Sequence, residues 1–136
     1  MAYEAITLET QGKNVEHRQT AIPNFVKGTV ALDDDNHHYL VVDGRGKRSM
    51  TVAVINETDQ TVTVTVFGAH NKTDTPESAQ VFELGQDAGD SQFAVTTASK
   101  GYECYHDPFP YFIIDVVPGA SADGKDVTIL VDLLST

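Results

Sequence analysis

The feature that most constrains this chain is the alternation of apolar and polar residues along several short runs. It is clearest in RSMTVAVINETDQTVTVTVFG, residues 48–68, where Val alternates with Thr or Ala on either side of a polar break. A period of two places successive side chains on opposite faces of a β-strand, whereas an amphipathic helix needs a period of 3.6. No useful stretch has the helical period, so the chain is predicted to be all-β.

The two Val-containing runs predict a β-hairpin. Placing Val54 opposite Val62 also sets Val52 against Val64, which keeps the valines on one face. The loop of residues 56–60 then has a common hairpin length. The valine face is predicted to be core, and the threonine face is expected to meet solvent or another protein.

The C-terminal part repeats this design in PYFIIDVVPGASADGKDVTILVDLL. Pairing Val116 with Val127 across a Gly- and Asp-rich turn gives a wholly apolar inner face. The opposite face keeps large apolar groups, and exposing them on a monomer would leave a patch of the kind that marks an interface. This predicted interface contains Ile113, Val117, Leu130 and Leu134.

About eight short strands with frequent turns predict an antiparallel two-sheet sandwich, either jelly-roll or immunoglobulin-like. The pattern does not choose between these topologies. Residues 1–24 alternate weakly and are mostly polar, so they are interpreted as an N-terminal arm or extension. Residues 25–136 are predicted to form a single sandwich domain.

The net charge of −11 argues against a nucleic-acid partner, because phosphates need a basic surface. The acidic residues are interpreted as a solvated surface or as a surface complementary to a partner. The segment GRGKRS carries three cations, Arg45, Lys47 and Arg48. It is read either as a surface turn or as an electrostatic anchor to an acidic partner.

The chain contains no apolar run of the roughly 20 residues that a spanning helix needs, so no membrane association is expected. The first residues, MAYEAITLETQGK, lack the basic and apolar regions of a secretory signal. Synthesis in a cytoplasm is therefore expected.

No metal or cofactor is expected. His37 and His38 follow three aspartates, but adjacent residues on a strand point to opposite faces and would rarely share one ion. The aspartates also lack the alternating ligand spacing of a calcium loop, so the segment is interpreted as a polar turn.

No catalytic group is expected either. Cys104 and His106 lack the glycine-rich elbow of an activated nucleophile, and Cys104 is expected to be buried or half-buried. Asp115 and Asp132 share one face of the predicted hairpin but have no cleft around them, so they are interpreted as solvated charges. The chain is predicted not to be an enzyme.

The blocks VVDGRGKRS, TVTVTVFG, PYFIIDVV and DVTILVDL resemble a pattern of small β-sandwich virion proteins of tailed bacteriophages, most closely capsid cement (decoration) proteins. The resemblance covers roughly the last two-thirds of the chain. It implies a virion location after synthesis in the host cytoplasm, and binding to the major capsid protein or another virion protein. It also implies self-association as a dimer or trimer.

The alternative is a carbohydrate- or receptor-binding sandwich module of a phage tail or baseplate. Such modules display aromatic side chains on which sugars stack. The candidate aromatic residues are Tyr102, Tyr105, Phe109 and Tyr111.

Overall fold

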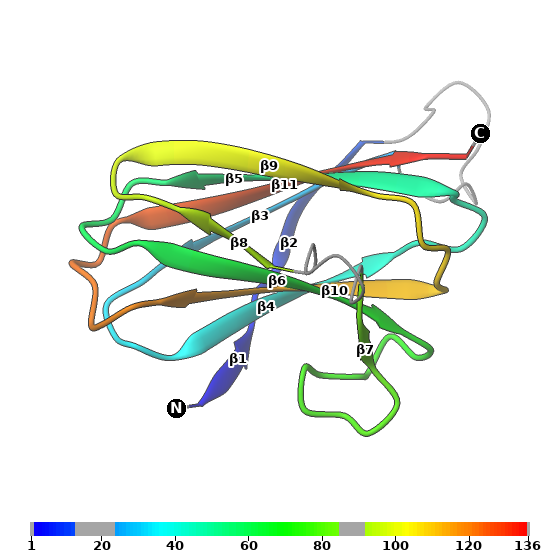
Figure 1. The fold of residues 1–136 in the computed structure, drawn as a ribbon, viewed down its shortest axis with the longest axis horizontal. Coiled ribbons are helices and arrows are strands. Elements are labelled where there is room, and N and C mark those ends of the chain that lie inside the picture. Colours follow the sequence, from blue (N-terminus) through cyan, green and yellow to red (C-terminus); the bar gives the residue numbers. More distant parts are fainter. Residues whose placement is uncertain (1, 13–23, 85–91, 136) are drawn as a thin grey trace.

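The computed structural model describes residues 2–12, 24–84 and 92–135, and these residues form strands without any helix (Figure 1). Accordingly, the described residues contain no helix that is able to span a membrane. The strands are β1 (Tyr3–Ala5), β2 (Leu8–Gly12), β3 (Phe25–Ala31), β4 (His37–Asp43), β5 (Ser49–Asn56), β6 (Val62–Ala69), β7 (Phe82–Glu83), β8 (Gln92–Val95), β9 (Ser99–Tyr105), β10 (Tyr111–Pro118) and β11 (Asp126–Leu134).

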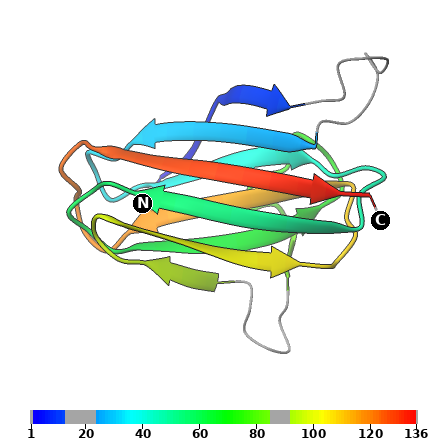
Figure 2. The ribbon, with the colours of Figure 1, turned by 90° about the horizontal axis from the view of Figure 1, so that it is seen from above.

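Two sheets stack face to face, which confirms the predicted sandwich. Sheet A has the order β1-β4-β10-β6, with β7 and β8 both paired to the free edge of β6. Sheet B has the order β2-β3-β11-β5-β9, and Figure 2 shows these five strands side by side. All pairings are antiparallel except that of β1 with β4.

The pairings are nested. Strand β3 pairs with β11, β4 with β10, β5 with β9 and β6 with β8. The first half of the domain therefore runs antiparallel to the second half as one long ribbon, and this ribbon wraps so that successive pairs lie in alternate sheets. This is the jelly-roll arrangement, so the structure decides the topology that the sequence pattern left open.

The predicted pairing of Val54 with Val62 is wrong. Val54 in β5 lies opposite Ile129 and Gly101 in sheet B, whereas Val62 in β6 lies opposite Pro118 and Val95 in sheet A. The connection between the two strands crosses from one sheet to the other. Matching valine faces arise equally well from strands that meet across the core, because both arrangements bury the same side chains.

The crossing turn is held by a buried amide rather than by strand pairing. The Asn56 side-chain amide donates hydrogen bonds to the carbonyls of Gln60, Val95 and Thr96 at 2.7, 3.0 and 3.2 Å. Thr58 donates its hydroxyl to Asn56 Oδ1 at 2.7 Å. These bonds join the end of β5 to the end of β8 in the other sheet.

The predicted pairing of Val116 with Val127 is wrong for the same reason. Val116 lies opposite Val64 and His38 in sheet A, and Val127 lies opposite Val30 and Asn56 in sheet B. The assignment of inner faces was nevertheless right. The core contains the alternating residues of β5, β6, β10 and β11, all at most 2% exposed: Met50, Val52, Val54, Val62, Val64, Val66, Phe112, Ile114, Val116, Val127, Ile129 and Val131.

The N-terminal segment contributes more structure than an arm. Its described part forms β1 at one edge of sheet A and β2 at one edge of sheet B, and Ile6 between them is buried in the core. Residues 13–23 of the predicted arm lie outside the described residues.

Candidate functional site

One end of the sandwich gathers the cationic turn, the C-terminal strand end and two aromatic side chains. The β4–β5 turn, the β9–β10 connection and the end of β11 meet there, on the right of Figure 1. We call this surface the basic end. It comprises Arg45, Lys47, Arg48, Phe82, Phe109 and Leu134.

Arg45 is held in a defined position although it is exposed. Its Nη2 and Nε donate hydrogen bonds to the Asp43 carboxylate at 2.7 and 3.0 Å, and its guanidinium lies 5.6 Å from the centre of the Tyr111 ring. Burial alone would raise the pKa of Asp43, but hydrogen bonds and charge from Arg45 outweigh it and lower that pKa. The guanidinium is thus oriented before any partner arrives.

The rest of the turn brings two more cations beside the C-terminal strand. Lys47 Nζ donates a hydrogen bond to Asn24 Oδ1 at 2.7 Å, and the Arg48 amide donates to the Leu134 carbonyl at 2.7 Å. Gly46 occupies the left-handed region at φ 77°, which lets this turn close without a steric penalty. Leu134 is 57% exposed next to these charges.

An aromatic cluster borders the same end. Phe82, 51% exposed, stacks on Phe109 with ring centres 6.4 Å apart, and His70 meets both rings edge-on. Phe109 packs directly on Gly68, where an added Cβ would lie 2.3 Å from its ring. Glycine at this inward position therefore creates the space for the aromatic cluster.

The four predicted apolar interface residues do not form one surface. Ile113 and Val117 lie on β10 in sheet A, whereas Leu130 and Leu134 lie on β11 in sheet B. Ile113 is fully buried, Val117 and Leu130 are half-buried, and only Leu134 is exposed. Leu134 instead joins Arg45, Lys47 and Arg48, so four of the seven predicted interface residues meet at the basic end.

The two aspartates suspected of forming a pair are separated as well. Asp132 is exposed on sheet B, but Asp115 is 2% exposed on the outer side of sheet A. The prediction that Asp115 is a solvated charge is therefore wrong. Its Oδ2 lies 2.7 Å from His37 Nδ1, and the Tyr3 ring stacks on His37 with centres 4.3 Å apart.

Asp115 is the buried member of this pair, whereas the His37 side chain is 17% exposed. Burial raises the pKa of Asp115, while the hydrogen bond and charge of His37 oppose the rise. Burial raises the pKa of Tyr3, and the charges of Asp115 and Glu77 raise it further. A substrate has no access to Asp115 here, so we assign the pair a structural role.

The remaining candidate metal, catalytic and sugar-binding residues do not come together in one site among the described residues. His37 and His38 point to opposite faces of β4, as predicted, but they begin the strand instead of forming a turn. Cys104 is exposed on β9, contrary to the expected burial, and its sulfur lies 3.5 Å from the Thr51 hydroxyl. Of the suspected sugar-stacking residues, Tyr102 is 69% exposed and Tyr105 is buried.

Phe82 is the member of the basic end that the sequence analysis missed. It sits in AQVFELG, which reads as an ordinary short strand, and β7 has only two residues. No local sequence pattern predicts that the Phe82 ring is exposed. Gly68 and Phe109 have complementary sizes, but this indicates an aromatic cluster only after the structure shows that the two residues are in contact.

No protein-family model matches the chain, and no curated protein sequence is similar to it. Solved structures resemble it in fold only. PirA is 10% identical with a TM-score of 0.49, covering 88% of this chain and 99% of that chain. The g-type lysozyme inhibitor PliG of Aeromonas hydrophila is 14% identical with a TM-score of 0.46, covering 97% of each chain.

A prophage-derived protein is also among these structures. YomS of the SPBc2 prophage is 12% identical with a TM-score of 0.43, covering 85% of this chain and 98% of that chain. β-Sandwich carbohydrate-binding modules occur among the further matches. At these identities the likeness concerns the sandwich architecture alone.

Proposed function

We propose that this chain is a non-enzymatic structural protein of a phage virion that binds the capsid shell as a cement (decoration) protein. The observation that carries the proposal is the basic end: three cations, one of them paired with Asp43, and an exposed leucine gather on one end of a chain with net charge −11. A local cationic surface on an acidic protein favours one orientation toward an acidic partner.

The resemblance to cement proteins points to the same place. Two of its blocks, VVDGRGKRS and PYFIIDVV, meet at this end, where Arg45 lies over Tyr111. A cement protein stabilises a shell by binding only the arrangement in which neighbouring subunits are correctly placed. Self-association as a dimer or trimer would multiply that effect by raising the effective concentration on the shell.

Co-sedimentation with candidate phage shells tests the proposal. We expect Arg45→Glu/Arg48→Glu to abolish binding, because it reverses both exposed charges of the turn. The matched control is Lys100→Glu/Lys125→Glu, which makes the same change in net charge at two exposed positions away from the basic end. An equal loss of shell binding in both double variants would show that net charge alone causes the loss. The basic end would then not be the binding surface.

The second candidate is a carbohydrate- or receptor-binding module of a tail or baseplate. The half-exposed Phe82 on Phe109 offers a flat apolar surface suited to a sugar ring. A glycan array decides between the two functions. This candidate is favoured if the wild-type protein binds glycans but does not co-sediment with shells, and if Phe82→Ala removes the glycan binding. Light scattering on the same samples measures self-association.

A further inference from the structure

A second group of polar side chains lies where β1 meets the start of β4. His38 is the inward-facing residue there, and its side chain is only 9% exposed. Its Nε2 is buried and has no hydrogen-bond partner among the described residues. Leaving a buried polar atom unpaired is unfavourable, so this nitrogen calls for an explanation.

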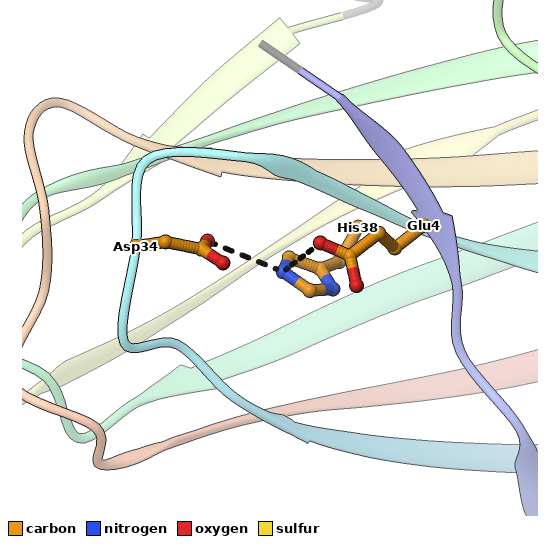
Figure 3. Close-up of side chains that lie close together, drawn as sticks. All are labelled: Glu4, Asp34 and His38. Atoms are coloured by element: carbon orange, nitrogen blue, oxygen red, sulfur yellow. Dashed lines mark ion pairs between the residues drawn. The ribbon is translucent and has the colours of Figure 1, made fainter.

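Two carboxylates converge on that nitrogen from different parts of the chain (Figure 3). Asp34 Oδ1, from the β3–β4 connection, lies 3.6 Å away, and Glu4 Oε2, from β1, lies 4.0 Å away. Both distances exceed that of a hydrogen bond. The three atoms all lie within 4.8 Å of one another, so they surround a small common space.

The spacing suits a bound metal ion. An ion with bonds of about 2.0–2.2 Å in tetrahedral geometry holds its ligand atoms about 3.3–3.6 Å apart. The two carboxylate oxygens lie 3.6 and 4.0 Å from His38 Nε2 and within 4.8 Å of each other, so side-chain movements would be needed to close the three atoms around one ion.

Asn36 orients both carboxylates from outside. Its Nδ2 donates hydrogen bonds to Glu4 Oε2 at 2.9 Å and to Asp34 Oδ2 at 3.1 Å, and its backbone amide donates to Asp34 Oδ1 at 3.0 Å. Outer-shell partners of this kind fix the geometry of metal ligands. The carboxylates are thus held toward His38 although they are partly exposed.

We propose that His38, Glu4 and Asp34 bind one divalent transition-metal ion of the zinc type. One imidazole nitrogen with two carboxylate oxygens suits such an ion better than calcium or magnesium, which prefer oxygen ligands alone. The fourth position is open to water or to a partner's side chain. The bound ion fastens β1 to the β3–β4 connection.

This proposal reverses the expectation of no metal that the sequence supports. That expectation compared His38 with its neighbour His37, which points the other way. Glu4 and His38, the most distant of the proposed ligands in sequence, are more than 30 residues apart. They meet because β1 pairs in parallel with β4, which sets Glu4 opposite His38.

Metal titration of the tag-free, chelator-treated full chain tests the site. We expect Zn²⁺ to bind with saturation at one ion per chain in calorimetry, and to raise the melting temperature by mass action. Asp34→Asn and Glu4→Gln should each weaken the affinity by about tenfold or more. Asp35→Asn is the matched control, since it removes the same charge from the adjacent exposed position and should bind like the wild type.

Nitrogen-15 spectra of the histidine rings provide an independent readout. Zn²⁺ should shift the Nε2 resonance of His38 and leave that of the exposed His106 unchanged. The proposal is overturned by the absence of saturable binding, by equal weakening in Asp35→Asn, or by a shift at another histidine. The carboxylates would then be polar neighbours of His38 without a metal ion between them.

Discussion

The outer faces of the two sheets differ in how far they are covered. On sheet A, Thr65, Ile113 and Asp115 are 6%, 0% and 2% exposed, and Figure 1 shows the β6–β7 segment passing on that side of the sheet. On sheet B, Leu130 is half-buried and Tyr102 is 69% exposed. Alternation in sequence therefore identifies the face that meets the core, but it does not say whether the other face is wet.

One signal of two-sided burial was present. The run Phe112-Ile113-Ile114 breaks the alternation of β10, and a continuous apolar run is typical of a strand covered on both faces. The hairpin register instead predicts Ile113 to be an intermolecular contact. Its cover comes from the same chain.

The largest expected effect contrasts one residue from each outer face. Ile113→Asp should prevent folding, because it buries an unpaired charge at a cost of several kcal/mol. Leu130→Glu on half-buried sheet B should leave the monomer folded, within about 1 kcal/mol of the wild type. Urea unfolding followed by circular dichroism measures both, and a folded Ile113→Asp protein would show that sheet A is not covered as described.

Removal of the N-terminal strand should have the next largest effect. Deleting residues 1–7 takes away β1, the buried Ile6 and the Tyr3 ring over His37. We expect a loss of about 2–5 kcal/mol in the free energy of unfolding, as for other large core truncations. An unchanged melting temperature would restore the simpler view of this segment as an arm used only for partner binding.

A smaller effect separates the polar pairs on the two outer faces. His37→Ala leaves the buried Asp115 without its partner and should cost about 1–3 kcal/mol. Thr128→Ala removes the 3.4 Å contact with the Thr29 hydroxyl on sheet B, where water replaces the lost group, and should cost under about 1 kcal/mol. Similar losses of stability in the two variants, measured by thermal unfolding, would show that the outer faces of the two sheets are equally covered.

The smallest effect concerns accessibility rather than stability. Cys104 on the outer side of sheet B should react with a thiol reagent in the folded protein at nearly the rate of a free thiol. Thr65→Cys in a Cys104→Ser background places a thiol beneath the cover of sheet A and should react only after denaturant is added. Rapid reaction of both thiols would mean that the outer side of sheet A opens readily to the reagent.

Much of the candidate site could be read from composition, but its assembly could not. The segment with Arg45, Lys47 and Arg48 was recognised as a cationic surface turn because its glycines and charges are adjacent. The hairpin register that points to Leu134 is wrong, and this residue belongs to the basic end because its carbonyl accepts a hydrogen bond from the Arg48 amide. That bond follows from the pairing of β11 with β5, which spans most of the chain.

The sequence by itself determined the all-β class and the residues that face the core, because side-chain alternation is a local property of a strand. Only the tertiary structure decided which strands pair, since valine faces of β5 and β6 match equally well within one sheet or across two. The same holds for the basic end, for the cover over Ile113 and for the group around His38. Each of these features joins segments that are far apart in the chain. Such long-range contacts form, and stabilise the protein, only when the chain has folded into the jelly roll.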